Sequence, residues 1–354
     1  MIAVDVFSGA GGLSEGLKGA EFRIGAAIEI DPVAVDTYKA NHPEVVIFRQ
    51  DVKTVRGTDI LGVLQARPID LMASCPPCQG FSTLSGRREG DDPRNELVHE
   101  VSRLARELKP RMLMMENVPG LLTRGKPLFD ELVAGLLDLK YKLVWSTLQV
   151  ADYGVPQMRR RLVLFGARGF APQLPDPTHD RLGRGGRMQW RTVRDAIPAG
   201  IGRPVPLPTA RRSGGPQSHN WHVVREISDL NRKRLKDARP GHGWETLPKE
   251  LRVKCHQEAP AGYFSNVYGR MAWNRPGPTI TAGCTNPGMG RFGHPSQLRT
   301  ISVREAALLQ TFPEDYIFDT DLIGRATSMI GNALPCTFAE ALAASCKSQL
   351  KRAG

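Results

Sequence analysis

The first half of the chain alternates short apolar runs with helical stretches, and this alternation constrains the fold more than any other feature. The runs are IAVDVF, RIGAAIEI, VVIFRQD, IDLMASC and RMLMMENV, each typical of a short buried strand. Between them, LSEGLKGA, PVAVDTYKANH and NELVHEVSRLARELK are predicted helices. Strand and helix in alternation predict an α/β fold with a doubly wound parallel sheet. YKLVWSTLQV and RRRLVLFGA predict a later strand pair.

The amino-acid composition of the sequence changes after about residue 168. From there to about residue 300, Pro, Gly, Arg and His are frequent and long apolar runs are few. Four of the five tryptophans lie in this stretch, which favours a small, loop-rich, ordered domain over a disordered insert. The last stretch is helical again and is expected to return to the first domain. The predicted division is 1–198 for the first domain, 199–300 for the second, 301–324 for a hinge and 325–354 for a C-terminal helix.

The charge balance favours a polyanionic partner. The formal net charge is +12 and the sequence pI is about 9.7. The 48 basic residues comprise 13 Lys and 35 Arg, and the planar guanidinium fork of Arg grips phosphates and guanine edges. A basic surface kept for solubility is the simpler alternative.

Neither a membrane nor a secreted location is indicated. The N-terminus MIAVDVFSGAGG has no basic region and is interrupted by Asp5, so it does not predict a signal peptide. No apolar run is long enough to span a bilayer. The sequence therefore predicts a cytoplasmic protein whose six cysteines stay reduced and form no disulfide framework.

A glycine turn near the N-terminus points to a cofactor. VDVFSGAGGLSEGL predicts a strand, a glycine turn and a helix, where free backbone amides meet a ligand. Glu29 ends the second predicted strand, 18 residues after Gly11 (29 − 11 = 18), which is close to the spacing of a ribose-binding carboxylate. Asp51 ends the third. Either acid alone is most simply a solvated strand end, but together they suggest an adenosine-containing cofactor.

The segment SCPPCQGFS holds Cys75 and Cys78, and three chemistries share this spacing. A zinc site needs about four ligands, and the other cysteines stand far apart without a second C-x-x-C. A redox pair usually opens a helix, whereas Cys78 precedes a polar, glycine-rich, basic stretch typical of a loop over a substrate. The remaining possibility is a single nucleophilic thiol at Cys78, with Pro76 and Pro77 fixing its approach.

Two further segments carry chemistry-bearing side chains. Glu116 in ENVPG follows an apolar run, where it would either cap a helix or, beside a thiol nucleophile, donate a proton. YGVPQMRRRLVLFG holds Gln157, Arg159 and Arg161. Residues two apart on an extended strand face the same way, so Arg159 and Arg161 would hold an anion or polarise a carbonyl, or simply line a charged edge strand.

In this order, the segments resemble the motifs of the DNA (cytosine-5) methyltransferase family of the bacterial restriction-modification type. DVFSGAGGLS resembles its cofactor loop, PPCQGFS its nucleophile loop, ENVPG its acid motif and VPQMRRRLVLFG its glutamine-arginine motif. HPSQLRTISVREAALLQTFPEDY and IGNALP resemble its closing motifs. The match runs from residue 3 to about 340. It implies a Rossmann-like mixed sheet of the S-adenosylmethionine-dependent methyltransferase fold, with catalytic domain 1–198 and target-recognition domain 199–300.

The resemblance implies a covalent mechanism on a flipped-out cytosine. Cys78 would attack carbon 6 of the base, and Glu116 would bind nitrogen 3 and supply a proton. Arg161 would hold the carbonyl oxygen, and Arg159 would help to position the thiol and its loop. S-adenosylmethionine would deliver the methyl group to carbon 5, and no metal is needed.

The resemblance also implies two sets of binding residues. The cofactor contacts would be Phe7, Gly9, Gly11, Glu29, Ile30, Asp51, Val52, Pro77 and Asn332. The nucleic-acid contacts would be Gln79, Ser82, Arg87, Arg88 and Arg94 in the loop after the nucleophile, with Arg270 and Thr279 in the recognition domain.

The implied partner is double-stranded DNA, bound by a monomer in the bacterial cytoplasm at the nucleoid. A cognate restriction endonuclease acting separately is a further implied partner. Two alternatives share the resemblance: a transfer-RNA cytosine-5 methyltransferase, since YFSNVYGR is faintly similar to that branch, and a catalytically silent DNA-binding relative. A disulfide oxidoreductase ranks last.

Overall fold

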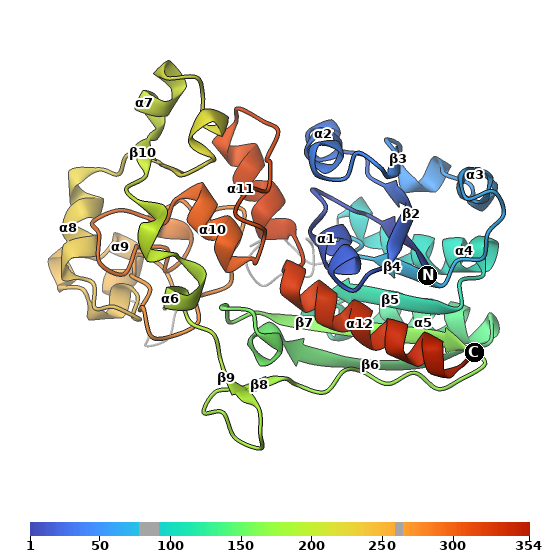
Figure 1. Ribbon diagram of the computed structural model, residues 1–354. Coiled ribbons are helices and arrows are strands. Elements are labelled where there is room, and N and C mark those ends of the chain that lie inside the picture. Colours follow the sequence, from blue (N-terminus) through green and yellow to red (C-terminus); the bar gives the residue numbers. More distant parts are fainter. Residues whose placement is uncertain (78–91, 259–264) are drawn as a thin grey trace. The chain divides into compact units, whose positions relative to one another are not determined.

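The apolar runs of the first half become the central sheet of the chain (Figure 1). In this computed structural model, which describes residues 1–77, 92–258 and 265–354, the chain divides into two compact units. The sheet unit comprises Met1–Tyr153, Arg160–Pro177 and Leu334–Gly354. The loop unit comprises Gly154–Arg159 and Thr178–Ala333.

The sheet of the sheet unit is mixed. Its described strands are β1 (Ile2–Val6), β2 (Arg23–Ile28), β3 (Val46–Phe48), β4 (Leu71–Ser74), β5 (Met112–Asn117), β6 (Tyr141–Gln149) and β7 (Arg160–Arg168). Their spatial order is β3-β2-β1-β4-β5-β7-β6. The first five in this order pair in parallel, whereas β7 runs antiparallel to both β5 and β6. The order reverses at β1, which is the doubly wound pattern that the sequence predicts.

Helices cover both faces of this sheet (Figure 1). They are α1 (Gly12–Gly19), α2 (Pro32–Asn41), α3 (Gly57–Val63), α4 (His99–Leu108), α5 (Lys126–Asp138) and α12 (Cys336–Arg352), with 3-10 turns η1 (Val52–Thr54), η3 (Pro93–Val98), η4 (Pro119–Leu122) and η5 (Val150–Tyr153). Val4 and Val6 join one apolar core with side chains of α3, α4 and α5. Because strand side chains alternate, Asp5 faces the other side and meets Ser14 of α1. α12 packs against α1, where Gly16 allows the backbone to approach Ala339 closely.

The loop unit is built from short elements joined by long connections. Its strands are β8 (His179–Asp180), β9 (Met188–Gln189), β10 (Val205–Pro206) and β11 (Val223–Val224). Its helices are α6 (Val193–Ala196), α7 (Leu207–Arg212), α8 (Asp229–Asp237), α9 (Lys254–Gln257), α10 (Val303–Leu309) and α11 (Ile323–Asn332), with 3-10 turns η6 (Ala199–Ile201), η7 (Gln217–His219), η8 (Trp244–Thr246), η9 (Lys249–Leu251) and η10 (Pro287–Met289). Tryptophans anchor it: Trp221 is buried and donates to the Phe318 carbonyl, and Trp244 stacks on His256.

The compact units end at different residues from the predicted domains. Residues 178–198 belong to the loop unit because the backbone amides of Val193 and Arg194 donate to Arg275 and Trp273. α11 also belongs to the loop unit, so the chain returns to the sheet unit at Leu334 rather than at residue 325. Pro335 precedes α12 directly and lacks an amide hydrogen, which separates α11 from α12. Among the described residues, no helix is both long enough and apolar enough to cross a membrane.

Candidate active site

Several predicted site residues lie at or just after the carboxyl ends of the parallel strands. The segment after β1 holds Phe7, Gly9 and Gly11; Glu29 follows β2, and Glu116 lies within the last two residues of β5. The carboxyl ends of parallel strands meet at one edge of a sheet, where open α/β sheets bind their ligands. Motifs that are far apart in the sequence therefore lie at the same edge of the sheet unit.

The segment after β1 adopts an unusual backbone. Phe7, Gly9 and Gly11 have φ values of 63°, 54° and 94°. A Cβ on Gly9 would meet nothing within 4 Å, so glycine is favoured there by conformation and not by space. Phe7 is not a glycine, and a non-glycine residue in this region is a strained conformation of the kind that clusters at ligand sites. Gly11 forms the N-cap of α1.

Glu29 holds this segment in place. Its Oε2 accepts a hydrogen bond from the Gly9 amide at 2.9 Å, and its Oε1 accepts from the amides of Ile30 and Asp31 at 2.9 and 2.8 Å. Burial raises the pKa of Glu29, although these amide donors oppose the shift. The Ile30 side chain is 61% exposed and offers an uncovered apolar surface beside the carboxylate.

Asp5 is a candidate site residue that the sequence motifs did not single out. Its Oδ2 accepts from Ser14 Oγ at 2.6 Å, and Ser14 Oγ lies 2.7 Å from the Tyr38 hydroxyl. Its Oδ1 is buried and has no hydrogen-bond partner among the described residues. Burial raises the pKa of Asp5 to about 7, with a further contribution from the Glu29 carboxylate. An acidic residue inside an apolar strand was the signal that could have identified it.

These acids fit a cationic, hydroxyl-bearing ligand. The unpartnered Asp5 Oδ1 and the Glu29 carboxylate lack nearby basic partners in the described structure, and S-adenosylmethionine carries an ammonium group, a sulfonium centre and ribose hydroxyls. Asp51 caps η1 by accepting from the Lys53 amide at 3.0 Å. The carbonyl of buried Val52 accepts from Arg103 at 2.8 Å.

The approach to the nucleophile loop is fixed from β5. Asn117, which is 3% exposed, donates from Nδ2 to the Pro76 carbonyl at 3.2 Å and accepts from the Val118 amide at 2.7 Å. The Cys75 amide donates to Val6. Pro77 is half-buried and is the last described residue before the gap. The predicted site residues Cys78, Gln79, Ser82, Arg87 and Arg88 lie outside the described residues.

Glu116 and Arg161 form a largely buried ion pair. Arg161 Nε lies 2.5 Å from Glu116 Oε1, and the two side chains are 13% and 11% exposed. β5 and β7 create this pair because they run antiparallel, with Glu116 opposite Val163. Burial lowers the pKa of Arg161, while Glu116 opposes this shift. Burial and the Glu116 charge raise the pKa of Cys75 well above the ordinary thiol range, so Cys75 is held as a neutral thiol.

Arg159 has a different environment from Arg161. β7 begins at Arg160, so Arg159 lies just outside the strand on which the sequence predicted both side chains. Within the loop unit, the Arg159 guanidinium donates to the carbonyls of Ile280, Gly331 and Ala333 at 2.8 to 3.3 Å. It therefore holds the backbone on both sides of Asn332, the last residue of α11.

A buried pair of glutamines supports the same segment. Gln157 Nε2 donates to the Leu309 carbonyl at 3.1 Å and to Gln310 Oε1 at 2.8 Å, while its Oε1 accepts from the Ile280 amide at 3.0 Å. Gln310 Nε2 donates to the carbonyls of Ile330 and Ala333. The sequence motifs contain both glutamines, but only the structure shows that they bond to each other.

The other predicted nucleic-acid residues already have partners within the chain. Thr279 donates to the Met158 carbonyl at 2.8 Å. Arg270 is 9% exposed and donates to the carbonyls of Leu235, His294 and Gln297. Arg94 forms a two-point contact with Asp92, at 2.8 and 2.6 Å. Residues 1–77, 92–258 and 265–354 contain no group of three or more His, Cys, Asp or Glu side chains that could hold a metal ion.

Comparisons with known proteins show the family of this chain. The family model described as C-5 cytosine-specific DNA methylase matches residues 1–348. The Type II methylase M.HgiDII of Herpetosiphon aurantiacus is 35% identical over 98% of this chain and 95% of its own length. The Type II methyltransferase M1.HphI of Haemophilus parahaemolyticus is 32% identical, covering 96% of this chain and 85% of its own length.

Solved structures share the fold. A candidate DNA modification methyltransferase from an E. coli prophage superposes with a TM-score of 0.73 at 23% identity, over 99% of each chain. The S. pombe Dnmt2 methyltransferase gives a TM-score of 0.62 at 18% identity, also over 99% of each chain. The fold is therefore that of the S-adenosylmethionine-dependent methyltransferases. With the family model covering nearly the whole chain, this protein belongs to the C-5 cytosine-specific DNA methylases and uses S-adenosylmethionine to methylate cytosine in DNA.

Proposed function

We propose that the carboxyl edge of the sheet carries out covalent methylation of cytosine, with Cys78 as nucleophile and Glu116 as acid. The observation that carries this proposal is the Glu116–Arg161 ion pair, at the end of β5 and next to Asn117, which holds Pro76. Cys78 comes two residues after Pro76 in the sequence, and its role rests on the family motif. The raised pKa of Cys75 supports assigning the nucleophile to the other cysteine.

The chemistry explains why these residue types are required. Carbon 5 of cytosine is a poor nucleophile, and addition of the Cys78 thiolate to carbon 6 pushes electron density onto carbon 5. Glu116 would bind nitrogen 3 and supply the proton that neutralises the adduct, and Arg161 would hold both Glu116 and the carbonyl oxygen of the base. S-adenosylmethionine supplies the methyl group when bound. The carbon 5 proton then leaves to water, the nitrogen 3 proton returns to Glu116, and cleavage of the bond to Cys78 sulfur restores the aromatic base and the thiolate.

Cofactor binding is assigned to the ends of β1, β2 and β3. Glu29 would accept from ribose hydroxyls while it fixes Gly9, and exposed Ile30 would cover one face of the adenine. The proposed contacts are Phe7, Gly9, Gly11, Glu29, Ile30, Asp51, Val52, Pro77 and Asn332. Arg159 would act through the backbone that carries Asn332, because its guanidinium already donates to carbonyls on both sides of that residue.

The loop unit is assigned to the recognition of a specific sequence in duplex DNA. A cytosine inside a duplex must be flipped out to be methylated, at a cost of about a few kcal/mol. Gln79, Ser82, Arg87, Arg88 and Arg94 are the proposed contacts of the nucleophile loop. Arg270 would act through the backbone it holds, since its donors are already bonded within the unit, and Thr279 likewise.

The names of the relatives support a restriction-modification role. Both M.HgiDII and M1.HphI are Type II enzymes, so we infer that a separate endonuclease cleaves the unmethylated form of the same sequence. We further propose that the protein acts as a monomer in the bacterial cytoplasm, on DNA of the nucleoid.

Covalent trapping tests the proposal. A duplex whose target cytosine carries fluorine at carbon 5 cannot lose a proton there, so the adduct with Cys78 should accumulate and shift the protein on a denaturing gel. Glu116→Gln should greatly reduce adduct formation, whereas Glu44→Gln, an exposed carboxylate of the same unit, should not. Methylation of transfer RNA but not of duplex DNA would refute the proposal, as would an adduct formed equally well by Cys78→Ser.

A further inference from the structure

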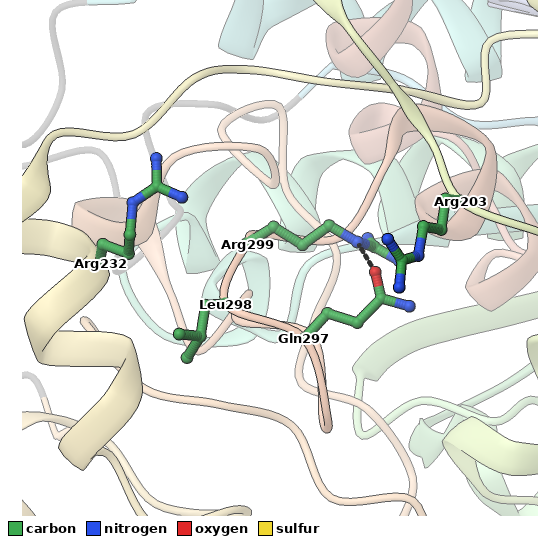
Figure 2. A pocket seen from close by; sticks show the side chains of 5 residues that line it. All are labelled: Arg203, Arg232, Gln297, Leu298 and Arg299. Atoms are coloured by element: carbon green, nitrogen blue, oxygen red, sulfur yellow. Dashed lines mark hydrogen bonds between the residues drawn. The ribbon is translucent and has the colours of Figure 1, made fainter.

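The loop unit contains an open hollow of about 410 Å³ lined by Arg203, Arg232, Gln297, Leu298 and Arg299 (Figure 2). In this view, Gln297 and Leu298 lie between Arg203 and Arg232. The lining residues come from three segments: the turn before β10, the first turn of α8 and the connection before α10. Gln297, Leu298 and Arg299 lie within the closing motif HPSQLRTISVREAALLQTFPEDY, but none of the five is among the predicted site residues.

Two of the three arginines have donors to offer. Arg203 is exposed, and its guanidinium bonds to none of the residues that the structure describes. Arg232 is 55% exposed, and its ion pair to Asp229 is long, at 3.9 Å. An exposed pair of this kind contributes little and would not prevent Arg232 from binding another anion.

Arg299 forms contacts through all three of its guanidinium nitrogens and orients Gln297. Its Nη1 and Nη2 contact the two Glu305 oxygens at 2.7 and 2.8 Å, and its Nε donates to Gln297 Oε1 at 2.7 Å. A guanidinium can only donate, so the amide oxygen of Gln297 must face Arg299. The Gln297 amide nitrogen bonds to none of the residues that the structure describes, so its two N–H donors are available to the hollow.

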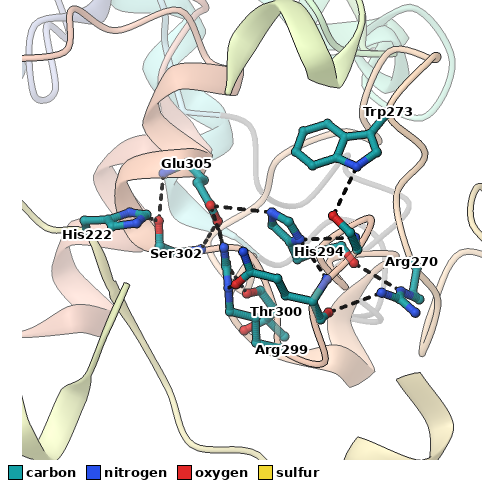
Figure 3. Close-up of polar contacts among 10 residues, drawn as sticks. His222, Arg270, Trp273, His294, Arg299, Thr300, Ser302 and Glu305 are labelled. Atoms are coloured by element: carbon teal, nitrogen blue, oxygen red, sulfur yellow. Dashed lines mark hydrogen bonds and ion pairs between the residues drawn. The ribbon is translucent and has the colours of Figure 1, made fainter. Parts of the chain in front are cut away.

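A buried network holds the segment that carries Arg299 (Figure 3). Glu305 is fully buried. Its carboxylate accepts a hydrogen bond from the Ser302 amide at 2.7 Å and lies 3.8 Å from the His294 ring. Burial, together with nearby Arg299, lowers the pKa of His294 to about 4, so its ring is neutral near pH 7. His294 Nδ1 accepts from the amides of Ser296 and Gln297 at 3.2 and 3.0 Å, which holds the backbone on which Gln297 and Leu298 sit.

We propose that this hollow binds a phosphodiester of the substrate duplex through Arg203, Arg232 and the Gln297 amide nitrogen. Three donor groups from separate segments, with no carboxylate among the described residues that line the hollow, suit an anion that accepts from several sides. The major-groove edges of adenine and cytosine present an amino donor and would also require an acceptor, and guanine needs only one planar fork. Leu298, 40% exposed, would lie against the apolar face of the neighbouring sugar. The site rests on the proposed role of the loop unit in holding DNA, and it is independent of base readout.

The test is duplex binding as a function of salt concentration, followed by fluorescence anisotropy, for the double variant Arg203→Ala/Arg232→Ala. The matched control is Arg67→Ala, an exposed arginine of the sheet unit, before β4 and so away from the carboxyl edge. Removing one phosphate interaction should flatten the slope of log affinity against log salt by about 0.9 and weaken binding roughly eightfold at 0.1 M salt. The double variant should therefore lose one or two phosphate interactions of this size in both slope and affinity. Its melting temperature and its methylated sequence should stay unchanged.

Three results would overturn the site. If bisulfite sequencing shows that the double variant methylates a different sequence, the hollow reads bases. If the double variant binds duplex DNA as tightly as Arg67→Ala does, DNA does not use the hollow. Calorimetry with inorganic phosphate gives the third result. If the double variant loses phosphate binding while its duplex affinity is unchanged, the hollow is a small-anion site. Failure of the unmodified protein to bind or methylate duplex DNA would instead refute the proposed function. Gln297→Leu should give a smaller loss in the same direction as the double variant.

Discussion

Glu29→Gln tests whether one carboxylate both shapes the cofactor loop and binds the cofactor. The carboxylate accepts three amide hydrogens, from Gly9, Ile30 and Asp31, at 2.8 to 2.9 Å. Glutamine has the same shape but one acceptor oxygen. Whichever way the new amide turns, at least one backbone N–H loses its acceptor. If the oxygen keeps Ile30 and Asp31, the new NH₂ group faces the Gly9 amide, donor against donor.

The magnitude follows from the kind of bond that is removed. A hydrogen bond to a charged group contributes about 1.5–3 kcal/mol. Since 1.4 kcal/mol corresponds to a factor of ten, the dissociation constant for S-adenosylmethionine should rise roughly 10- to 150-fold. Calorimetric titration of the DNA-free protein measures this directly, and a thermal melt of each variant confirms that it is folded. The methylated sequence, read by bisulfite sequencing at saturating cofactor, should not change.

The matched control is Asp36→Asn, which removes the same charge from α2. Its side chain is 51% exposed and an ion pair of 4.0 Å links it to Arg49, so cofactor affinity should stay within about twofold. Unchanged affinity in Glu29→Gln would refute the cofactor role of this carboxylate, and equal weakening in both variants would reduce it to a general charge effect. A shift in the methylated sequence would contradict the assignment of recognition to the loop unit.

Three further predictions follow from the site. Burial raises the pKa of Asp5 from 3.8 to about 7, so the folded state binds a proton more tightly than the unfolded chain, and stability falls as pH rises between these values. Asp5→Asn should therefore stabilise the cofactor-free protein at pH 8, by at most about 4 kcal/mol. Denaturant titrations should show that this gain in unfolding free energy shrinks towards pH 4. A gain that does not depend on pH would contradict the burial of the charge. Cys78→Ser should abolish methyl transfer in a labelled-cofactor assay while Cys75→Ser keeps most of it, and equal losses would revive the redox-pair interpretation. Arg159→Lys should weaken cofactor binding with little change in duplex affinity, measured by calorimetry and anisotropy, because two guanidinium nitrogens share these three carbonyls and lysine offers a single nitrogen.

The apolar runs and the motif order were enough to predict the central sheet and the place of the site. The predicted strands IAVDVF, RIGAAIEI, IDLMASC and RMLMMENV became β1, β2, β4 and β5, because a sheet that is covered on both faces requires near-continuous apolar runs of this length. The acids at Glu29 and Glu116 then fell at strand ends, where parallel strands bring them to one edge. The pattern was too weak to predict α3 and α5, and YKLVWSTLQV alone did not specify that β6 would pair only with β7.

The partners of the charged groups were decided by tertiary structure alone. Arg159 and Arg161 are two residues apart, yet one donates to carbonyls more than 100 residues away and the other meets Glu116. Arg270 was predicted to contact DNA, but its donors serve carbonyls within the loop unit. Local periodicity reports which face of an element is buried, since that depends on near neighbours in the chain. A hydrogen-bond partner depends on how distant segments pack, and that information appears only once the chain has folded.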